Sequence, residues 1–338
     1  MSETRGAAQP DPKGDADAEK AAPAVVVHPF QSLSDESIDK LVKSLASLTE
    51  GELAVTMLVA CGTRAVEPLR RLLLEGKAVS VAEPRRRAVR ALAELGEVDT
   101  LLEYLTQPRA IPDPILRLSE ETVQSLAARC VMRWRTEKVR HTLLELAARH
   151  MLPGVAEALG TCHVAEAIPY LVRALGDDIN RGPAAEALTG MMAEAQPWLV
   201  AAALHPEPSS DQENASSLRR RRRALRLLLE AGNIENEWIA LRPLLHDRDA
   251  DIAVTSARLG LKVSQAREEL MLIGVLLQFA AVDDWLLQSE ISDALVAHYV
   301  AAEPLIRKAV AQRKASAGGW DRGLAILHEV LRHGEGQK

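Results

Sequence analysis

The sequence contains few aromatic residues and few cysteines, and each shortage excludes a class of protein. Aromatic side chains make up 3% of the 338 residues. Segments that alternate valine, isoleucine or threonine with polar residues are scarce, so a β-sheet protein is not expected. The three cysteines, Cys61, Cys130 and Cys162, lie far apart and provide neither a disulfide framework nor a paired metal-ligand spacing. We expect all three to be small buried side chains.

Long apolar runs and a net positive charge are also missing. No segment approaches the roughly 18 consecutive apolar residues of a membrane span, and the N-terminus lacks the basic and apolar regions of a secretory signal. We therefore expect no membrane partner and a cytoplasmic location. The formal net charge of −6 argues against a dedicated nucleic-acid-binding protein, because such proteins neutralise phosphates with a positive surface.

Two helical patterns recur along the chain and alternate with each other. In the first pattern a proline precedes a leucine-rich helical run, at Pro68, Pro169, Pro197, Pro243 and Pro304. In the second pattern an alanine-rich helix closes on glycine, at 88–96, 155–160, 184–190 and 252–260. The proline spacings correspond to one or more copies of a unit of roughly 30 to 35 residues. The alternation predicts an all-α fold built from repeated helix pairs.

The size of this unit predicts that the pairs stack. Ordering the backbone costs about 1 to 2 kcal/mol per residue, and a chain below about 40 residues buries too little surface to offset that cost alone. Neighbouring units must therefore share their apolar faces. The expected result is an elongated, curved α-solenoid in which one helix of each pair lines a groove suited to another macromolecule.

The repeated unit resembles a known family. A proline early in the first helix, an aspartate in the turn, an arginine entering the second helix and an alanine-leucine-glycine ending are similar to HEAT repeats. The similarity is to the short bacterial kind, the PBS-lyase type, which also occurs in bilin lyases, and it covers roughly 34–333. The resemblance implies a right-handed α-solenoid of stacked antiparallel helix pairs. It implies little about activity, since such repeats mostly serve as scaffolds and adaptors.

We expect one elongated domain over 32–334. Residues 1–31 mix alanine, proline, glycine and charged residues without helical periodicity, which predicts a disordered tail. Prolines at 108, 112 and 114 predict a loop insertion near 106–119, and a polar stretch predicts a second insertion at 205–217. Residues 335–338 are expected to fray.

Five consecutive arginines, Arg219 to Arg223, directly follow the acidic part of the second insertion, which contains Asp211 and Glu213. The neighbouring leucines imply that Arg221 and Arg222 face the core side of their helix. In one interpretation they pair with the aspartates of the turns 177–178 and 247–251 in an internal ladder, which contributes about 0 to 1 kcal/mol per exposed pair. In the other they bind an anionic partner, to which arginine presents fork-shaped donors. The acidic stretch could also cover the arginines until a partner displaces it.

Arginines outside this run complete the set of candidate site residues. If Arg85, Arg86 and Arg90 occupy an equivalent helix start, they would continue the same stripe. The candidate partner-binding residues are Arg85, Arg86, Arg90, Arg133, Trp134, Arg135, Arg140, Arg219, Arg221 and Arg222.

Three kinds of enzyme have HEAT-like architecture, and each needs side chains that can be sought in this sequence. Di-iron hydroxylases need several His-Glu pairs, and His328-Glu329 is the only such dipeptide. Bilin lyases need an aromatic-lined cleft, whereas the aromatic residues of this chain are dispersed. HEAT-like DNA alkylpurine glycosylases use a basic groove with tryptophans, and Arg133-Trp134-Arg135 is the nearest match. Their catalytic carboxylate has no identifiable position here, so we expect no catalytic residue, metal, cofactor or small-molecule substrate.

The sequence therefore predicts a non-catalytic scaffold or adaptor. Its groove would bind a protein partner with an acidic surface or segment, and arginine-rich helix starts would recognise the acidic groups. The alternative is a nucleic-acid-binding or DNA-repair protein that uses the segment around Trp134.

Overall fold

The computed structural model describes residues 33–76, 80–107, 110–209, 212–263, 266–316 and 322–336. Within these ranges the regular structure is helical apart from one short antiparallel ribbon, β1 (Pro208–Ser209) with β2 (Gln212–Glu213). The prediction of an all-α chain is therefore confirmed for this part. In the same ranges no helix combines the length and the apolar character that crossing a membrane would need. The predicted disordered tail, 1–31, lies outside the described residues.

The helices alternate between two layers. The even-numbered helices form one layer: α2 (Gly51–Ala60), α4 (Glu83–Glu94), α6 (Pro114–Val131), α8 (Pro153–Thr161), α10 (Arg181–Gly190), α12 (Ala215–Ala231), α14 (Ala250–Val263), α16 (Trp285–Ala297) and α18 (Arg322–Glu335). The odd-numbered helices form the other: α1 (Asp35–Ser44), α3 (Val66–Leu74), α5 (Val98–Thr106), α7 (Glu137–Arg149), α9 (Ile168–Ala174), α11 (Met192–Leu204), α13 (Trp238–Leu241), α15 (Ala266–Gln278) and α17 (Tyr299–Ser316). Each even-numbered helix from α2 to α16 contacts the next even-numbered helix.

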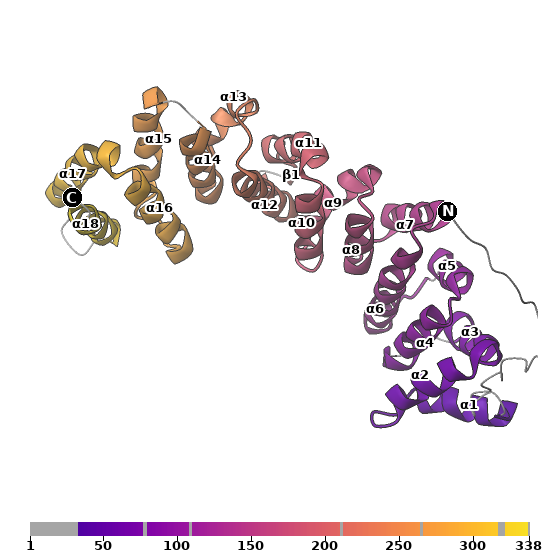
Figure 1. Cartoon of the computed structure of the whole chain (residues 1–338). Coiled ribbons are helices and arrows are strands. Elements are labelled where there is room, and N and C mark those ends of the chain that lie inside the picture. The colour runs from indigo at the N-terminus through magenta and orange to yellow at the C-terminus, as the bar shows by residue number, and fades with distance from the viewer. Residues whose placement is uncertain are drawn as a thin grey trace, which may run out of the picture.

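The double row of helices follows an arc (Figure 1). The even-numbered helices lie on the inner side of this arc, and we call them the inner layer; the odd-numbered helices form the outer layer (Figure 1). Short 3-10 helices join the two layers at η2 (Gly62–Ala65), η3 (Met132–Trp134), η4 (Ala165–Ala167) and η5 (Arg242–His246). The inner layer is thus a continuous surface along which a partner could lie.

The two recurring sequence patterns separate into these two layers. The alanine-rich patterns fall in α4, α8, α10 and α14 of the inner layer, and the prolines fall in α3, α9, α11, η5 and α17. Only Gly96 follows the end of its helix, where its φ is +85°. Gly160 lies within α8, where an added Cβ would collide with Ala187 of α10. The glycine at that position therefore serves close helix packing rather than helix termination.

Apolar side chains from both layers form one core that extends from Ile38 to Leu331. Burying a leucine or isoleucine side chain contributes about 1.5 to 3 kcal/mol. Successive helix pairs share this core and contact one another along the chain, which is the physical reason for stacking.

Both predicted insertions are shorter than expected. Helix α6 begins at Pro114, because Asp113 accepts hydrogen bonds from the backbone N–H groups of Ile115 and Leu116 and caps the helix. Proline is well tolerated at the first position of a helix, so it marks the start here rather than a loop. Helix α12 begins at Ala215 with Asn214 as its cap, so the second insertion ends at 214 and contains the ribbon. At the other end, α18 reaches Glu335, within the segment that was expected to fray.

Candidate functional site

Arg221 lies at the centre of a buried ionic cluster. Its guanidinium donates to Glu213 at 2.7 Å, to Asp247 at 2.5 Å and to the backbone carbonyl of Ala203 at 2.8 Å. The residue is 4% exposed. Glu213, at the end of the β1–β2 ribbon, thus covers this arginine. One interpretation of the sequence was that the acidic stretch covers the arginines, and Glu213 agrees with it. Asp211, the other acidic residue of that stretch, lies outside the described residues.

The other four arginines of the run also have carboxylate partners. Arg219 lies 3.4 Å from Asp178, Arg220 contacts Glu207 at 2.5 Å, Arg222 donates to Asp249 at 2.9 Å, and Arg223 lies 3.2 Å from Glu230. Asp178, Asp247 and Asp249, which pair with Arg219, Arg221 and Arg222, belong to the turns 177–178 and 247–251. These contacts have the arrangement of the internal ladder, in which each arginine is neutralised within the protein.

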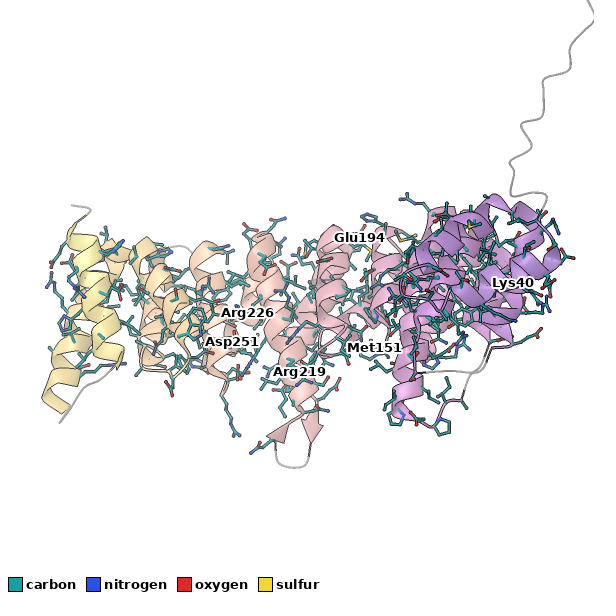
Figure 2. All side chains as sticks on the ribbon, turned by 90° about the horizontal axis from the view of Figure 1, so that it is seen from below. Lys40, Met151, Glu194, Arg219, Arg226 and Asp251 are labelled. Atoms are coloured by element: carbon teal, nitrogen blue, oxygen red, sulfur yellow. The ribbon has the colours of Figure 1, made fainter. Side chains whose placement is uncertain are left out.

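The ladder continues across the inner layer from α12 to α16. Arg226 of α12 lies 3.0 Å from Asp251 of α14 and 2.7 Å from Glu290 of α16. Figure 2 shows Arg226 beside Asp251, with Arg219 closer to the ribbon. Arg258 of α14 meets the second oxygen of Glu290 at 2.7 Å. We call Arg222, Arg226, Arg258, Asp249, Asp251 and Glu290 the arginine network; it links three consecutive inner helices.

A second buried cluster lies at the start of α4. Arg85, which is 3% exposed, pairs with Glu120 of α6 and donates to the carbonyl of Leu73 at 2.8 Å. Its guanidinium lies 5.3 Å from the ring centroid of Tyr104, whose hydroxyl donates to Glu120 at 2.7 Å. Arg85 therefore closes a polar cluster inside the core.

Arg86 and Arg90 lie nearer the surface of α4. Arg86 contacts Glu83 at 2.9 Å, while Arg90 and the buried Arg87 share Glu52 of α2. The hydrogen bonds that Arg90 and Arg87 donate to Glu52 lower the pKa of its carboxyl group.

These positions correct two of the predicted partner-binding residues. Arg85 and Arg221 are almost completely buried and already paired, so neither can reach a partner while the fold is intact. Helices α4 and α12 are also separated in the inner layer by α6, α8 and α10. The two arginine clusters are therefore separate internal ladders and do not form one continuous stripe.

The candidate nucleic-acid segment is largely neutralised as well. Arg140 pairs with Glu137 at 2.6 Å and with Glu166, and its hydrogen bond to Glu137 lowers the pKa of that carboxyl. Trp134 is half-buried against the core, with the guanidinium of Arg133 5.0 Å from its ring centroid. Arg133 also donates to the carbonyl of Ala93 at 3.0 Å. Within the described residues, Arg133 and Arg135 are the cations of this segment that make no ion pair.

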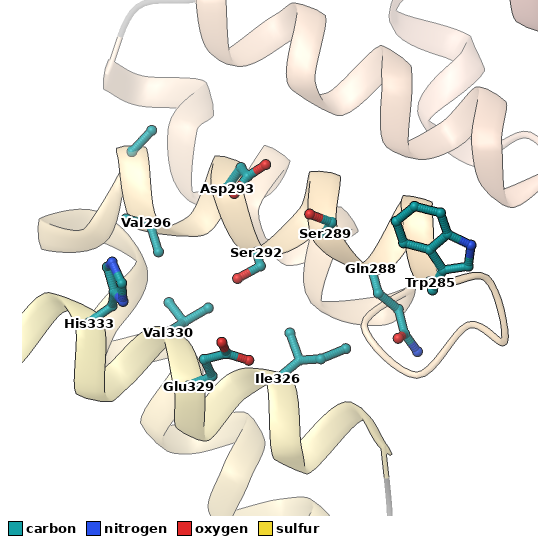
Figure 3. A pocket seen from close by; sticks show the side chains of 11 residues that line it. Trp285, Gln288, Ser289, Ser292, Asp293, Val296, Ile326, Glu329, Val330 and His333 are labelled. Carbon is teal, nitrogen blue, oxygen red and sulfur yellow. The ribbon is translucent and has the colours of Figure 1, made fainter.

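A cleft that the sequence did not reveal lies between α16 and α18, at the C-terminal end of the inner layer. Its volume is about 520 Å³. Figure 3 shows Glu329 pointing from α18 toward Ser292 of α16, with Trp285 at one end of the cleft and His333 at the other. The lining residues are Trp285, Gln288, Ser289, Ser292, Asp293, Val296, Ala297, Ile326, Glu329, Val330 and His333.

Trp285 is the most unusual residue of this cleft because it is 79% exposed. It is the first residue of α16, directly after Asp284, which accepts hydrogen bonds from the backbone N–H groups of Leu286 and Leu287. The cap fixes the start of the helix and so holds the indole at the mouth of the cleft. Other apolar side chains are equally exposed, but Trp285 combines its exposure with a place beside a concave, partly apolar surface, which is where aromatic residues anchor protein partners.

Metal-ligand groups and the cysteine thiols were the clearest catalytic features to look for among the described residues. In these ranges no group of three or more histidine, cysteine and acidic side chains could hold a metal ion. Burial raises the pKa of the Cys61, Cys130 and Cys162 thiols, which disfavours the nucleophilic thiolate. Cys61 is buried as expected, whereas Cys130 and Cys162 are only half-buried.

Comparisons with known proteins leave the family open. No protein-family model matches the chain, and no curated protein matches it. Among solved structures, an engineered protein is similar over 89% of this chain and 89% of its own, at 17% sequence identity and a TM-score of 0.35. That TM-score carries no argument about fold or function.

Proposed function

We propose that the double row of helices is a right-handed, HEAT-like α-solenoid and that the protein is a non-catalytic scaffold or adaptor. A protein partner would bind on the inner layer, and the cytoplasmic location expected from the sequence belongs to the same proposal. The separation of the two sequence patterns into two layers supports the solenoid. The continuous succession of contacts from α2 to α18 supports an extended binding surface.

The cleft with its exposed Trp285 is the observation that carries the binding role. The arginines first expected to bind a partner are mostly paired inside the protein, so they no longer identify the site. Trp285 presents a large, rigid apolar surface beside an apolar floor of Val296, Ile326 and Val330, with polar residues around it. Binding energy in protein interfaces concentrates in such aromatic anchors.

Selection from a phage-displayed library of random peptides, about three helical turns or twelve residues long, tests this function on the full chain. We expect enriched peptides whose affinity falls by about 30-fold with Trp285→Ala, as for an interface hot spot. Trp198→Ala is the matched control, because Trp198 is 48% exposed and lies on α11 of the outer layer. Circular dichroism should show unchanged helicity for both variants.

Three results would contradict the scaffold function: no enriched peptide, equal binding to the Trp285→Ala variant, or equal losses from both tryptophan variants. The first two exclude the cleft as a binding site. The third would show that exposed tryptophans bind the peptides without regard to their position.

Nucleic-acid binding through Trp134 is the second candidate function. The absence of an ion pair at Arg133 and Arg135, within the described residues, favours it, since these cations stay available beside an aromatic ring. A fluorescent DNA duplex separates the two functions. Salt-sensitive binding that Arg133→Ala and Arg135→Ala abolish, with Trp285→Ala neutral, would replace the scaffold proposal by this one.

A further inference from the structure

The acidic groups of the cleft differ from those in the rest of the inner layer. Asp293 and Glu329 line the cleft, and no lysine or arginine lines it with them. Neither carboxylate makes an ion pair with any described residue. Glu290, three residues before Asp293 on α16, is by contrast shared between Arg226 and Arg258. The cleft therefore carries negative charge that the protein itself leaves uncompensated.

The uncompensated charge shares the cleft with an aromatic ring. Glu329 points into the cleft between Ile326 and Val330, toward Ser292, and Trp285 lies farther along, at one end of the same surface (Figure 3). The Glu329 carboxylate offers a cationic side chain a charge-assisted hydrogen bond. The indole of Trp285 offers a second, flat surface to a neighbouring side chain of the same segment. The cleft is thus complementary to a short segment that carries a cation.

The remaining lining fits the rest of a peptide. Val296, Ile326 and Val330 form an apolar floor that suits the aliphatic stem of a lysine or arginine, or an apolar neighbour. Gln288, Ser289 and Ser292 supply hydrogen-bonding groups along α16. From Trp285 to Ala297 the helix rises about 18 Å, the length of roughly five extended residues.

From this geometry we propose that the cleft between α16 and α18 binds a short protein segment through a lysine or arginine side chain. The cation meets Glu329, a neighbouring side chain of the segment lies against Trp285, and apolar side chains rest on the floor. The inference rests on the proposed scaffold function and names the chemistry of its partner. It reverses the charge expected from the sequence: at this cleft the partner is basic and the protein supplies the acid.

The peptides that depend on Trp285 in the selection above are the probes for this inference. We expect most of them to contain an arginine or lysine with an apolar neighbour. Glu329→Gln should lower the affinity of the chain for these peptides about tenfold. Glu194→Gln is the matched control, because Glu194 is an exposed carboxylate on α11 with no ion pair among the described residues. It removes the same charge from the outer layer and should leave the affinity unchanged.

A charge reversal provides a second, independent measurement. Selection against the Glu329→Lys variant should replace the cationic position of the peptides by glutamate or aspartate. Trp285-dependent peptides without a preferred cation, or equal losses from Glu329→Gln and Glu194→Gln, would overturn this inference and leave the scaffold function standing. Failure to find any Trp285-dependent peptide would overturn both.

Discussion

The arginine network across α12, α14 and α16 and the cleft between α16 and α18 share a helix but differ in how their charges are compensated. In the network every carboxylate has a guanidinium partner, and Asp251 and Glu290 have two each. In the cleft, Asp293 and Glu329 have no ionic partner among the described residues. Helix α16 thus presents a neutralised face to α14 and an acidic face to α18.

This difference separates structural charges from available ones. A charge that is removed from water must be paired, or it costs several kcal/mol. The buried arginines of α4 and α12 therefore hold neighbouring helices in register and cannot be spared for a partner. The cleft carboxylates stay in contact with water, so a partner can use them without weakening the fold.

Arg221→Ala should have the largest effect on stability. The substitution leaves Glu213 and Asp247, with side chains 18% and 16% exposed, without their shared guanidinium. Breaking a buried ion pair in this way costs about 3 to 5 kcal/mol. Urea-induced unfolding followed by circular dichroism measures the loss.

Arg223→Ala provides the control for this measurement on the same helix. Arg223 pairs only with Glu230, at 3.2 Å near the surface, and its removal should cost at most about 1 kcal/mol. Similar losses from Arg221→Ala and Arg223→Ala would mean that burial does not distinguish the members of the arginine run.

The Arg85 cluster should show a smaller loss that a second substitution largely restores. Arg85→Met leaves Glu120 buried and unpaired, at an expected cost of about 3 kcal/mol. Adding Glu120→Leu removes that charge, so the double variant should regain all but about 1 kcal/mol, the value of the hydrogen bond that Tyr104 loses. A double-mutant cycle from urea unfolding measures this coupling. Additive losses would show that the pair contributes nothing beyond its separate residues.

The sequence predicted those parts of the two regions that depend on residues of the same helix or the next turn. It did not predict the parts that depend on helices packing against each other. The core-side position of Arg221 follows from the leucines around it in the same helix, and its partner Asp247 lies in the next turn. Arg85 likewise shares a face of α4 with Ala88, Val89 and Leu92, which are all buried. Its own helix therefore indicated its core-side position, whereas its partners Tyr104 and Glu120 follow only from the packing of α5 and α6 against α4.

The cleft depends entirely on such long-range packing. Trp285 after a capping aspartate was a visible signal in the sequence, since a large aromatic residue at a helix start has few neighbours to bury it. Glu329 stands out in the sequence only as part of the His328-Glu329 dipeptide. Their relation arises because α18 packs against α16, which no periodicity in the sequence records.

The smallest changes in the free energy of unfolding are expected for two single carboxylates, Asp177, which is hydrogen-bonded, and Glu329, which lines the cleft. Asp177 accepts hydrogen bonds from the backbone and the side chain of Asn180. Burial raises its pKa, but these bonds outweigh burial, so its pKa is lowered. A lowered pKa stabilises the fold above the ordinary carboxyl range, and this contribution disappears as the pH falls through the folded-state pKa. Asp177→Ala should therefore cost about 1 kcal/mol near neutral pH and progressively less in acid.

Glu329→Gln should change the free energy of unfolding by less than about 0.5 kcal/mol near neutral pH, because the cleft carboxylate holds no other element in place. Urea titrations of both variants and the unsubstituted chain, at neutral and acidic pH, give the comparison. A cost of Asp177→Ala that stays constant with pH would show that its hydrogen bonds do not depend on the charge. A large cost of Glu329→Gln would mean that the cleft charge is structural after all, and the distinction between the two regions would fail.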